Sequence, residues 1–124
     1  MDFFERKLDE KNRLTIPADL RHEFEGGKVI ITQGFKQYLH LYTEKVWNEK
    51  MEPALKGDIL DERTADLNVQ FRTGKQDTVM AVATGNGQCR ITLDQNLLDY
   101  AKIEKGGGVV AVRAGDYWRL TAKP

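Results

Sequence analysis

Two arginine residues each follow a polar segment rich in turn formers, and their chemistry suits contact with anions. Arg13 comes directly after Asp9-Glu10-Lys11-Asn12, and Arg90 comes shortly after Gly85-Asn86-Gly87-Gln88. A guanidinium donates hydrogen bonds in a planar fork that matches a phosphate or the edge of a guanine base. The carboxylate of Asp9, four residues before Arg13, can hold that guanidinium across the turn. The pair also has a purely structural interpretation, because an exposed ion pair closing a hairpin contributes at most about 1 kcal/mol.

Further polar side chains near these turns could contact DNA. Lys7 and Lys11 belong to a locally cationic first hairpin, although the whole chain is neutral, with 19 basic and 19 acidic residues. Asn12, Asn86 and Gln88 supply amide groups that can donate to and accept from base edges. Because the chain has no strong overall field, any binding of a polyanion must come from such local asymmetry.

Metal binding and nucleophilic catalysis are not indicated. His22 and His40 have no partner at metal-ligand spacing, and the single cysteine, Cys89, cannot form an internal disulfide. The motifs of nucleophile elbows and phosphate loops are absent. Gly106-Gly107-Gly108 precedes an apolar strand-like run instead of a helix, so we interpret it as a flexible turn. No feature selects a catalytic pair among the scattered carboxylates, and we expect no cofactor.

The length and composition suit one compact unit. The chain has 124 residues, of which 40% are hydrophobic and 31% are charged, as in a globular domain or two fused half-domains. The longest apolar run, Val79 to Ala83, is too short to span a bilayer. Asp2 and Glu5 are not typical of a secretory signal. We therefore expect a soluble, cytoplasmic protein without membrane contact.

An internal repeat indicates how the two turns are positioned. Residues 13–20 read Arg-Leu-Thr-Ile-Pro-Ala-Asp-Leu and residues 90–97 read Arg-Ile-Thr-Leu-Asp-Gln-Asn-Leu, which share three identities at a shift of 77. Further on, residues 28–31 match 108–111, and residues 38–41 match 117–120. Each copy is predicted to fold as β-turn-β-α-β-turn-β. The predicted helices are Ala18–Phe24 and Gln95–Ala101, and the predicted later strands are Val29–Thr32, Tyr38–Tyr42, Val109–Arg113 and Tyr117–Thr121.

The middle segment, residues 43–76, follows a helical period and is called the connector below. Thr43 and Glu44 start one helix, which Pro53 is expected to end or bend. A second helix is predicted from Asp61 to Arg72. Its apolar stripe is interpreted as buried core, with Trp47 as a further packing residue. The stripe consists of Leu60, Thr64, Leu67 and Phe71.

One copy of the repeat is too small to be stable alone, because four short strands and a two-turn helix bury little apolar surface. Two copies in one chain can pair across a pseudo-two-fold axis. Such pairing would bring Arg13 and Arg90 to one face of the molecule.

Residues Leu8 to Pro17 resemble the signature of the AbrB-like swapped-hairpin DNA-binding domains, and the whole arrangement resembles the MraZ family. The resemblance implies an α+β fold with two AbrB-like halves, 1–42 and 77–124, on either side of the connector. The halves would form a small barrel of the double-psi or swapped-hairpin type. The motifs that carry the resemblance are Asp9-x-x-x-Arg13, Leu39-His40-Leu41-Tyr42 leading into Trp47, Phe71-x-x-Gly74 and Arg90-Ile91-Thr92-Leu93.

The resemblance implies a nucleoid-associated transcriptional regulator that assembles into rings. Such a regulator binds repeated short boxes in double-stranded DNA upstream of the division and cell-wall genes, and it has no small-molecule substrate. Asp9 has its counterpart in Asn86, where the family has aspartate. The predicted DNA-binding residues are Arg13, Arg90, Lys7, Lys11, Asn12 and Gln88, and the predicted turn-orienting residues are Asp9 and Asn86.

Two other function classes remain as alternatives. The same fold serves as the dimerising half of antitoxins, which neutralise a protein partner through a tail, and we expect no long disordered tail here. A small enzyme or a ligand sensor is the third hypothesis, which a deep polar pocket would favour.

Overall fold

The computed structural model describes residues 1–82, 85 and 87–124, with Glu25 described by its backbone only. Asn86, a predicted turn-orienting residue, lies outside this set. The first half of the chain contains β1 (Phe3–Lys7), β2 (Arg13–Ile16), β3 (Lys28–Gln33), β4 (Leu39–Thr43), α1 (Glu44–Val46) and α2 (Glu52–Leu55). The second half contains α3 (Glu62–Arg72), β5 (Gln76–Val79), β6 (Ala81–Val82), β7 (Cys89–Thr92), α4 (Gln95–Ala101), β8 (Gly108–Ala114) and β9 (Tyr117–Ala122).

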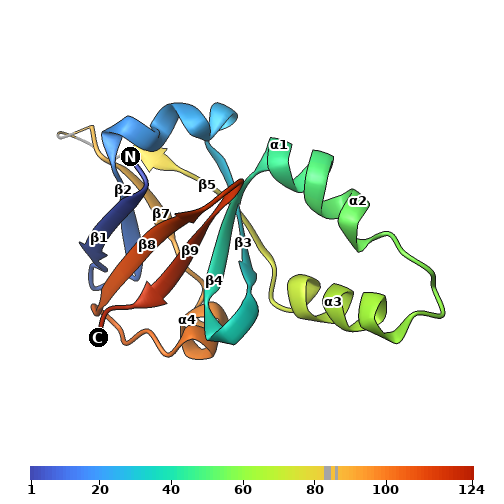
Figure 1. Cartoon of the computed structure of the whole chain (residues 1–124). Helices are drawn as coiled ribbons and strands as arrows, with labels where there is room; N and C mark the ends of the chain where they lie inside the picture. Colours follow the sequence, from blue (N-terminus) through green and yellow to red (C-terminus); the bar gives the residue numbers. More distant parts are fainter. Residues whose placement is uncertain (83–84, 86) are drawn as a thin grey trace.

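The strands form two antiparallel sheets in an α+β fold, and the main core lies between them. The larger sheet has the order β1-β8-β9-β4-β3-β5, and the smaller has the order β2-β7-β6 (Figure 1). Alternate residues of each sheet enter the core, for example Leu14 and Ile91 from the small sheet and Val109 and Ala111 from the large one. The described strands close no ring, so the expected barrel is not part of what this structure shows.

Matching residues of the sequence repeat face each other in both sheets. In the small sheet Leu14 is paired with Ile91, and in the large sheet His40 is paired with Arg119. The Leu14–Ile91 pair is one of the two inner pairs of its antiparallel ladder, and the His40–Arg119 pair is the middle pair of its ladder. A local two-fold axis through the two pairs would produce this register.

The helix predicted at Ala18–Phe24 is a 3-10 helix and not the α-helix that the repeat predicts. Residues Ala18–Glu23 form a 3-10 helix, in which the Leu20 N–H donates to the Pro17 carbonyl. Its counterpart α4 has the predicted bounds and ends at Lys102, whose φ of 56° lies in the left-handed region. The first segment is short, and Gly26 and Gly27, both with positive φ, follow it after only two residues, so an α-helical ladder has little room to propagate.

The connector forms two helical arms that project from the large sheet (Figure 1). The first arm runs without a break from Glu44 through a π-helical turn to Leu55, and the Thr43 hydroxyl accepts a hydrogen bond from the Val46 N–H. Pro53 does not end the arm, which continues to Leu55. It follows closely on the π-helical turn Trp47–Met51, where the regular α-helical hydrogen-bond pattern is already interrupted and can accommodate the missing N–H of proline.

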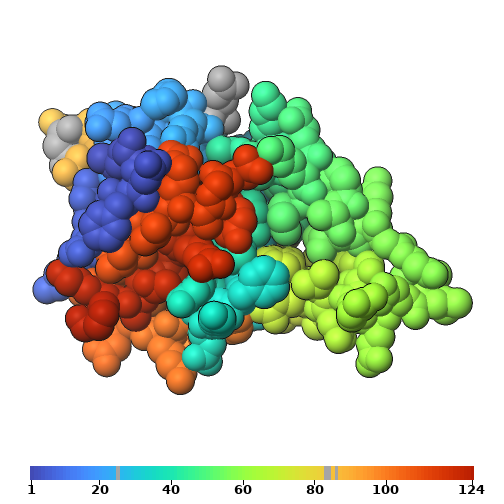
Figure 2. All heavy atoms as spheres, viewed as in Figure 1, coloured from blue at the N-terminus to red at the C-terminus, as the bar shows by residue number. Residues whose placement is uncertain are grey.

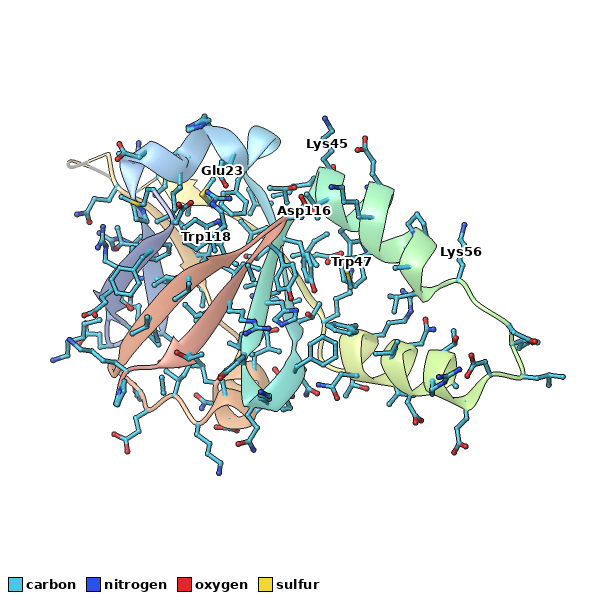
Figure 3. The ribbon with its side chains drawn as sticks, viewed as in Figure 1. Glu23, Lys45, Trp47, Lys56, Asp116 and Trp118 are labelled. Atoms are coloured by element: carbon cyan, nitrogen blue, oxygen red, sulfur yellow. The ribbon has the colours of Figure 1, made fainter. Side chains whose placement is uncertain are left out.

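The predicted core stripe of the second arm is buried only at its base. Phe71 is 3% exposed, Leu67 is 38% exposed and Leu60 is 90% exposed. The prediction of a fully buried stripe is therefore wrong for its outer part, because the arm meets the sheet only near its C-terminal end. Trp47 packs in a second core cluster with Phe71 and Tyr42, as predicted for Trp47 and Phe71 (Figure 3).

His40 lies at the centre of the large sheet in a buried aromatic environment. Its Nδ1 atom is 2.8 Å from the Tyr42 hydroxyl, and its Nε2 atom is buried without a hydrogen-bond partner among the described residues. The Phe71 and Tyr117 rings pack against it. Burial, with a smaller contribution from the positive charge of Arg119, lowers the pKa of His40 to about 4. The ring is therefore neutral in the folded protein near neutral pH.

This burial predicts an acid-dependent loss of stability. As the pH falls from about 6.5 towards 4, unfolded chains bind a proton at His40 before folded chains do, so the free energy of unfolding falls by up to about 3 kcal/mol. Urea unfolding at pH 7 and pH 4.5 should show a smaller pH dependence for His40→Gln than for the unsubstituted chain. His22→Gln, which changes the exposed histidine, is the matched control. Equal pH dependence in all three proteins would contradict the prediction.

Candidate nucleic-acid interface

Arg13 and Arg90 lie on the same face of the small sheet. In the β2–β7 ladder Arg13 is paired with Thr92, and Thr15 is paired with Arg90. Residues that alternate along a strand share a face, so these four side chains point away from the core. The two arginines are diagonal neighbours, a placement for which sheet geometry gives roughly 7–8 Å between Cα atoms. The predicted convergence of the arginines on one face agrees with this register.

The arginines line a concave pocket of about 360 Å³, called the arginine pocket below. Thr92 contributes a hydroxyl to the same pocket. Two guanidiniums and hydroxyl donors in one concavity can bind an anion, such as a phosphate oxygen. The remaining lining residues come from β5 and β6 and are Thr78, Val79, Ala81 and Val82.

The first turn holds Arg13 through Asp9. One carboxylate oxygen of Asp9 accepts hydrogen bonds from the backbone N–H groups of Lys11 and Arg13, each at 2.9 Å. The other accepts from Arg13 Nε at 2.5 Å. Partial desolvation raises the pKa of Asp9, but the hydrogen bonds from Arg13 and Lys11 outweigh it and leave this pKa below its ordinary value. Asn12 completes the turn with a φ of 58°, which asparagine tolerates better than most residues.

Among the described residues, the side-chain contact of Arg90 is longer than that of Arg13. The Arg90 Nη2 atom lies 3.5 Å from the Gln88 side-chain oxygen, at the long limit of a hydrogen bond. Among the contacts of the described residues, the ion pair of Arg13 with Asp9 is the shorter of the two.

The structure gathers only part of the predicted set around the arginine pocket. Lys11 is exposed in the first turn, and Asn12 donates to the Gln95 side chain at 3.3 Å. Lys7 lines a different pocket, beside Gly108 and Lys123. The sequence prediction missed Thr92, which lines the pocket, although its spacing of two residues from Arg90 in the same strand was a usable signal.

The described residues offer little for other chemistry. No group of three or more histidine, cysteine or acidic residues in this part of the chain could hold a metal ion. Among the helices of the same residues, none combines the length and apolar character needed to cross a membrane. Cys89 is a buried free thiol on the core side of β7.

A paired-strand face that presents two arginines is the kind of surface found in β-ribbon DNA-binding proteins, and comparison with known proteins agrees with this class. Residues 2–67 match the sequence profile described as "MraZ protein, putative antitoxin-like". The chain belongs to the MraZ family.

Several curated relatives carry the name transcriptional regulator MraZ. The protein of Roseiflexus castenholzii is 33% identical over 112 residues, covering 90% of this chain and 71% of the relative. That of Desulforamulus reducens is 34% identical over 113 residues, covering 90% and 75%. That of Cutibacterium acnes is 29% identical over 116 residues, covering 93% and 78%. The chain spans about two thirds to three quarters of the length of these and similar relatives, for example 66% of a Roseiflexus relative.

Family membership answers the question of catalysis. The relatives are named regulators of transcription and not enzymes, which confirms the prediction that the chain is not an enzyme.

The geometry of the first turn predicts separable effects of two substitutions at Asp9. Asp9→Ala removes the acceptor of two backbone N–H groups and the ion pair, and should lower the free energy of unfolding by about 1–2 kcal/mol. Asp9→Asn keeps an amide oxygen for the backbone groups and should cost less. Urea unfolding measures both, with Glu10→Ala in the same turn as the control. A loss for Asp9→Asn as large as for Asp9→Ala would show that the ion pair, and not the backbone hydrogen bonds, stabilises the turn.

Proposed function

We propose that the chain is a DNA-binding transcriptional regulator that contacts double-stranded DNA through the face carrying Arg13 and Arg90. The observation that carries the proposal is the β2–β7 register, which puts both guanidiniums on one solvent-facing surface. The names of the relatives support the same function. The proposed regulator acts in the cytoplasm at the nucleoid and needs no cofactor.

In this proposal the chain consists of two AbrB-like halves, residues 1–42 and 77–124, joined by the connector and completing one swapped-hairpin barrel. The pairing of Leu14 with Ile91 and of His40 with Arg119 supports a two-fold relation between the halves. The strand order of the large sheet supports it further, because β1 pairs with β8 of the other half and β5 pairs with β3. The halves thus act as one DNA-reading unit.

The two arginines have unequal roles in the proposed complex. Asp9 fixes the Arg13 side chain before DNA arrives, so that little side-chain entropy is lost on binding. Arg90 lacks so short a contact among the described residues and adjusts on binding. Lys11, Asn12 and Gln88 add contacts from the turns, and Lys7 adds a more distant phosphate contact.

Affinity must come from several copies acting together. A chain with balanced charge gains little non-specific attraction to DNA. We propose that copies assemble into a ring and bind repeated boxes in the promoter of the division and cell-wall gene cluster. Binding one box then raises the effective concentration of the other subunits at the neighbouring boxes.

A protein-interaction module of antitoxin type is the second candidate function. The description of the matching family contains the word antitoxin-like, which favours testing it. A pull-down that returned one small protein in stoichiometric amount, together with absence of DNA binding, would support this candidate over the first.

The proposed contacts predict a graded effect of two arginine substitutions. In mobility-shift titrations with the DNA upstream of the protein's own gene, Arg13→Ala should weaken binding by roughly 10- to 100-fold, as expected for loss of a good arginine contact. Arg90→Ala should weaken it less. Arg63→Ala, on the exposed side of α3, is the matched control and should bind normally. Unchanged binding by Arg13→Ala would reject the proposed site.

The proposed assembly predicts a steep dependence on the number of boxes. Once footprinting has defined a box, DNA with two boxes should bind at least tenfold more tightly than DNA with one. An insertion of half a helical turn between the boxes should remove most of the gain. Equal affinity for one and two boxes would contradict cooperative binding by an assembly while leaving single-box recognition intact.

A further inference from the structure

The arginine pocket has one wall that is apolar. Val79 and Ala81, called the apolar wall below, line the pocket together with Arg13 and Arg90. Val79 is 59% exposed, and Ala81 is exposed as well. Met80 between them packs against the main core, so the alternation of side chains along an extended segment directs its two neighbours to the other side. The apolar wall is therefore part of the solvent-facing surface of the pocket.

The register of the small sheet places the apolar wall beside Arg90. In the β6–β7 ladder Ala81 is paired with Arg90, and in the β2–β7 ladder Arg90 is paired with Thr15. Residues directly opposite each other on antiparallel strands share a face, with Cβ atoms roughly 4.5–5.5 Å apart. One row across three strands thus presents a methyl group, a guanidinium and a threonine side chain. Arg13 belongs to the next row, in which Thr92 is its partner.

The two arginines consequently have different neighbours. The small sheet has the order β2-β7-β6, so among the described residues no further strand of this sheet lies beside Arg13 on the outer side of β2. The Asp9 carboxylate is its close partner. Arg90 stands on the central strand and has Ala81 at its side. The surroundings of Arg13 are therefore ionic, whereas those of Arg90 include apolar groups.

A ligand that fits the surroundings of Arg90 must combine a hydrogen-bond acceptor with an apolar group. A phosphate supplies only the acceptor, because its charged oxygens gain no hydrogen bond from the apolar wall. In the major groove a guanine presents O6 and N7 to an arginine fork, and a thymine presents its C5-methyl group. Neighbouring bases are about 3.4 Å apart along a strand. An acceptor and a methyl group on adjacent bases are thus spaced much like the paired Arg90 and Ala81.

We propose that the apolar wall recognises the C5-methyl group of a thymine adjacent to a guanine that Arg90 binds. The inference rests on the proposed function, DNA contact through the arginine pocket, and adds a sequence preference to it. Val79 and Ala81 exclude water from the methyl group, and burial of one such group strengthens binding about fourfold. They act as specificity-determining residues, whereas Arg90 supplies the hydrogen bonds to the guanine.

Replacement of thymine by deoxyuridine tests the inference from the side of the DNA. The change removes the methyl group and keeps every hydrogen-bonding group of the base. In mobility-shift titrations with single-box duplexes, each thymine of the footprinted box is replaced in turn. For at least one thymine next to a guanine, the unsubstituted chain should bind the duplex with uracil about fourfold more weakly than the unmodified duplex.

Substitutions in the apolar wall test it from the side of the protein. Val79→Ser combined with Ala81→Ser makes the wall polar and should bind the two duplexes equally well. Both positions are exposed, so the fold should persist, which circular dichroism and urea unfolding would check. Val79→Ile keeps the wall apolar and should retain the preference for thymine.

Val69→Ser is the matched control, because Val69 is 65% exposed and lies on α3, outside the pocket. Figure 1 and Figure 2 show α3 at the end of the molecule away from the N-terminal strands β1 and β2. This variant should keep the full preference for thymine over uracil. The loss of preference is then specific to the apolar wall.

The outcomes separate failure of the inference from failure of the proposed function. Equal binding of both duplexes by the unsubstituted chain at every position, as expected if the wall contacts only sugar or phosphate, would overturn the inference. A preference that survives the double substitution in the apolar wall would overturn it as well. Both results leave the proposed function in place, because the chain still binds the DNA. Absence of binding to the unmodified duplex would instead reject the proposed function and the inference with it.

Discussion

The antiparallel pairing of β2 with β7 determines which side chains of both strands reach solvent. In the observed register Leu14 faces Ile91 in the core, and Arg13 and Arg90 stand on the opposite side. Side chains alternate along a strand, so reversing the facing of either strand would bury its arginine and expose its leucine or isoleucine. The apolar core and the cationic face are thus specified by the same few residues. Packing of Leu14 and Ile91 keeps the proposed DNA contacts in place.

Much of this arrangement could be predicted from the sequence because it depends on local alternation and on the repeat. Arg13-Leu14-Thr15-Ile16 alternates between polar and apolar residues, and its match to residues 90–93 predicts the pairing. The bounds of α4 follow from Leu97, Leu98 and Ala101, which are buried on one helix face. The Asp9–Arg13 ion pair follows from four-residue spacing across a turn. In these cases neighbouring residues along the chain carry the information.

Features that depend on how far one element reaches over another could not be predicted. The spacing of Leu60, Leu67 and Phe71 indicates one helical stripe, but periodicity does not tell where the sheet beneath the helix ends. The 3-10 geometry of Ala18–Glu23 depends on the glycine pair that follows it. The pocket formed by β5 and β6 beside the arginines joins segments without any sequence signal that relates them. The DNA contacts themselves stay predictions.

The connector is inserted between two halves that otherwise match. It removes the approximate two-fold symmetry on the outer face of the large sheet but leaves it intact in the β2–β7 pair of the small sheet. In the small sheet both halves contribute equivalent strands, and the two arginines lie together on its solvent-facing side. On the outer side one half is covered by Trp47 and Phe71, whereas the other exposes Phe3 and Val112. A symmetric face suits a ligand with its own two-fold symmetry, such as duplex DNA. The outer face of the large sheet is therefore asymmetric, although the strands that form it are related by an approximate two-fold axis.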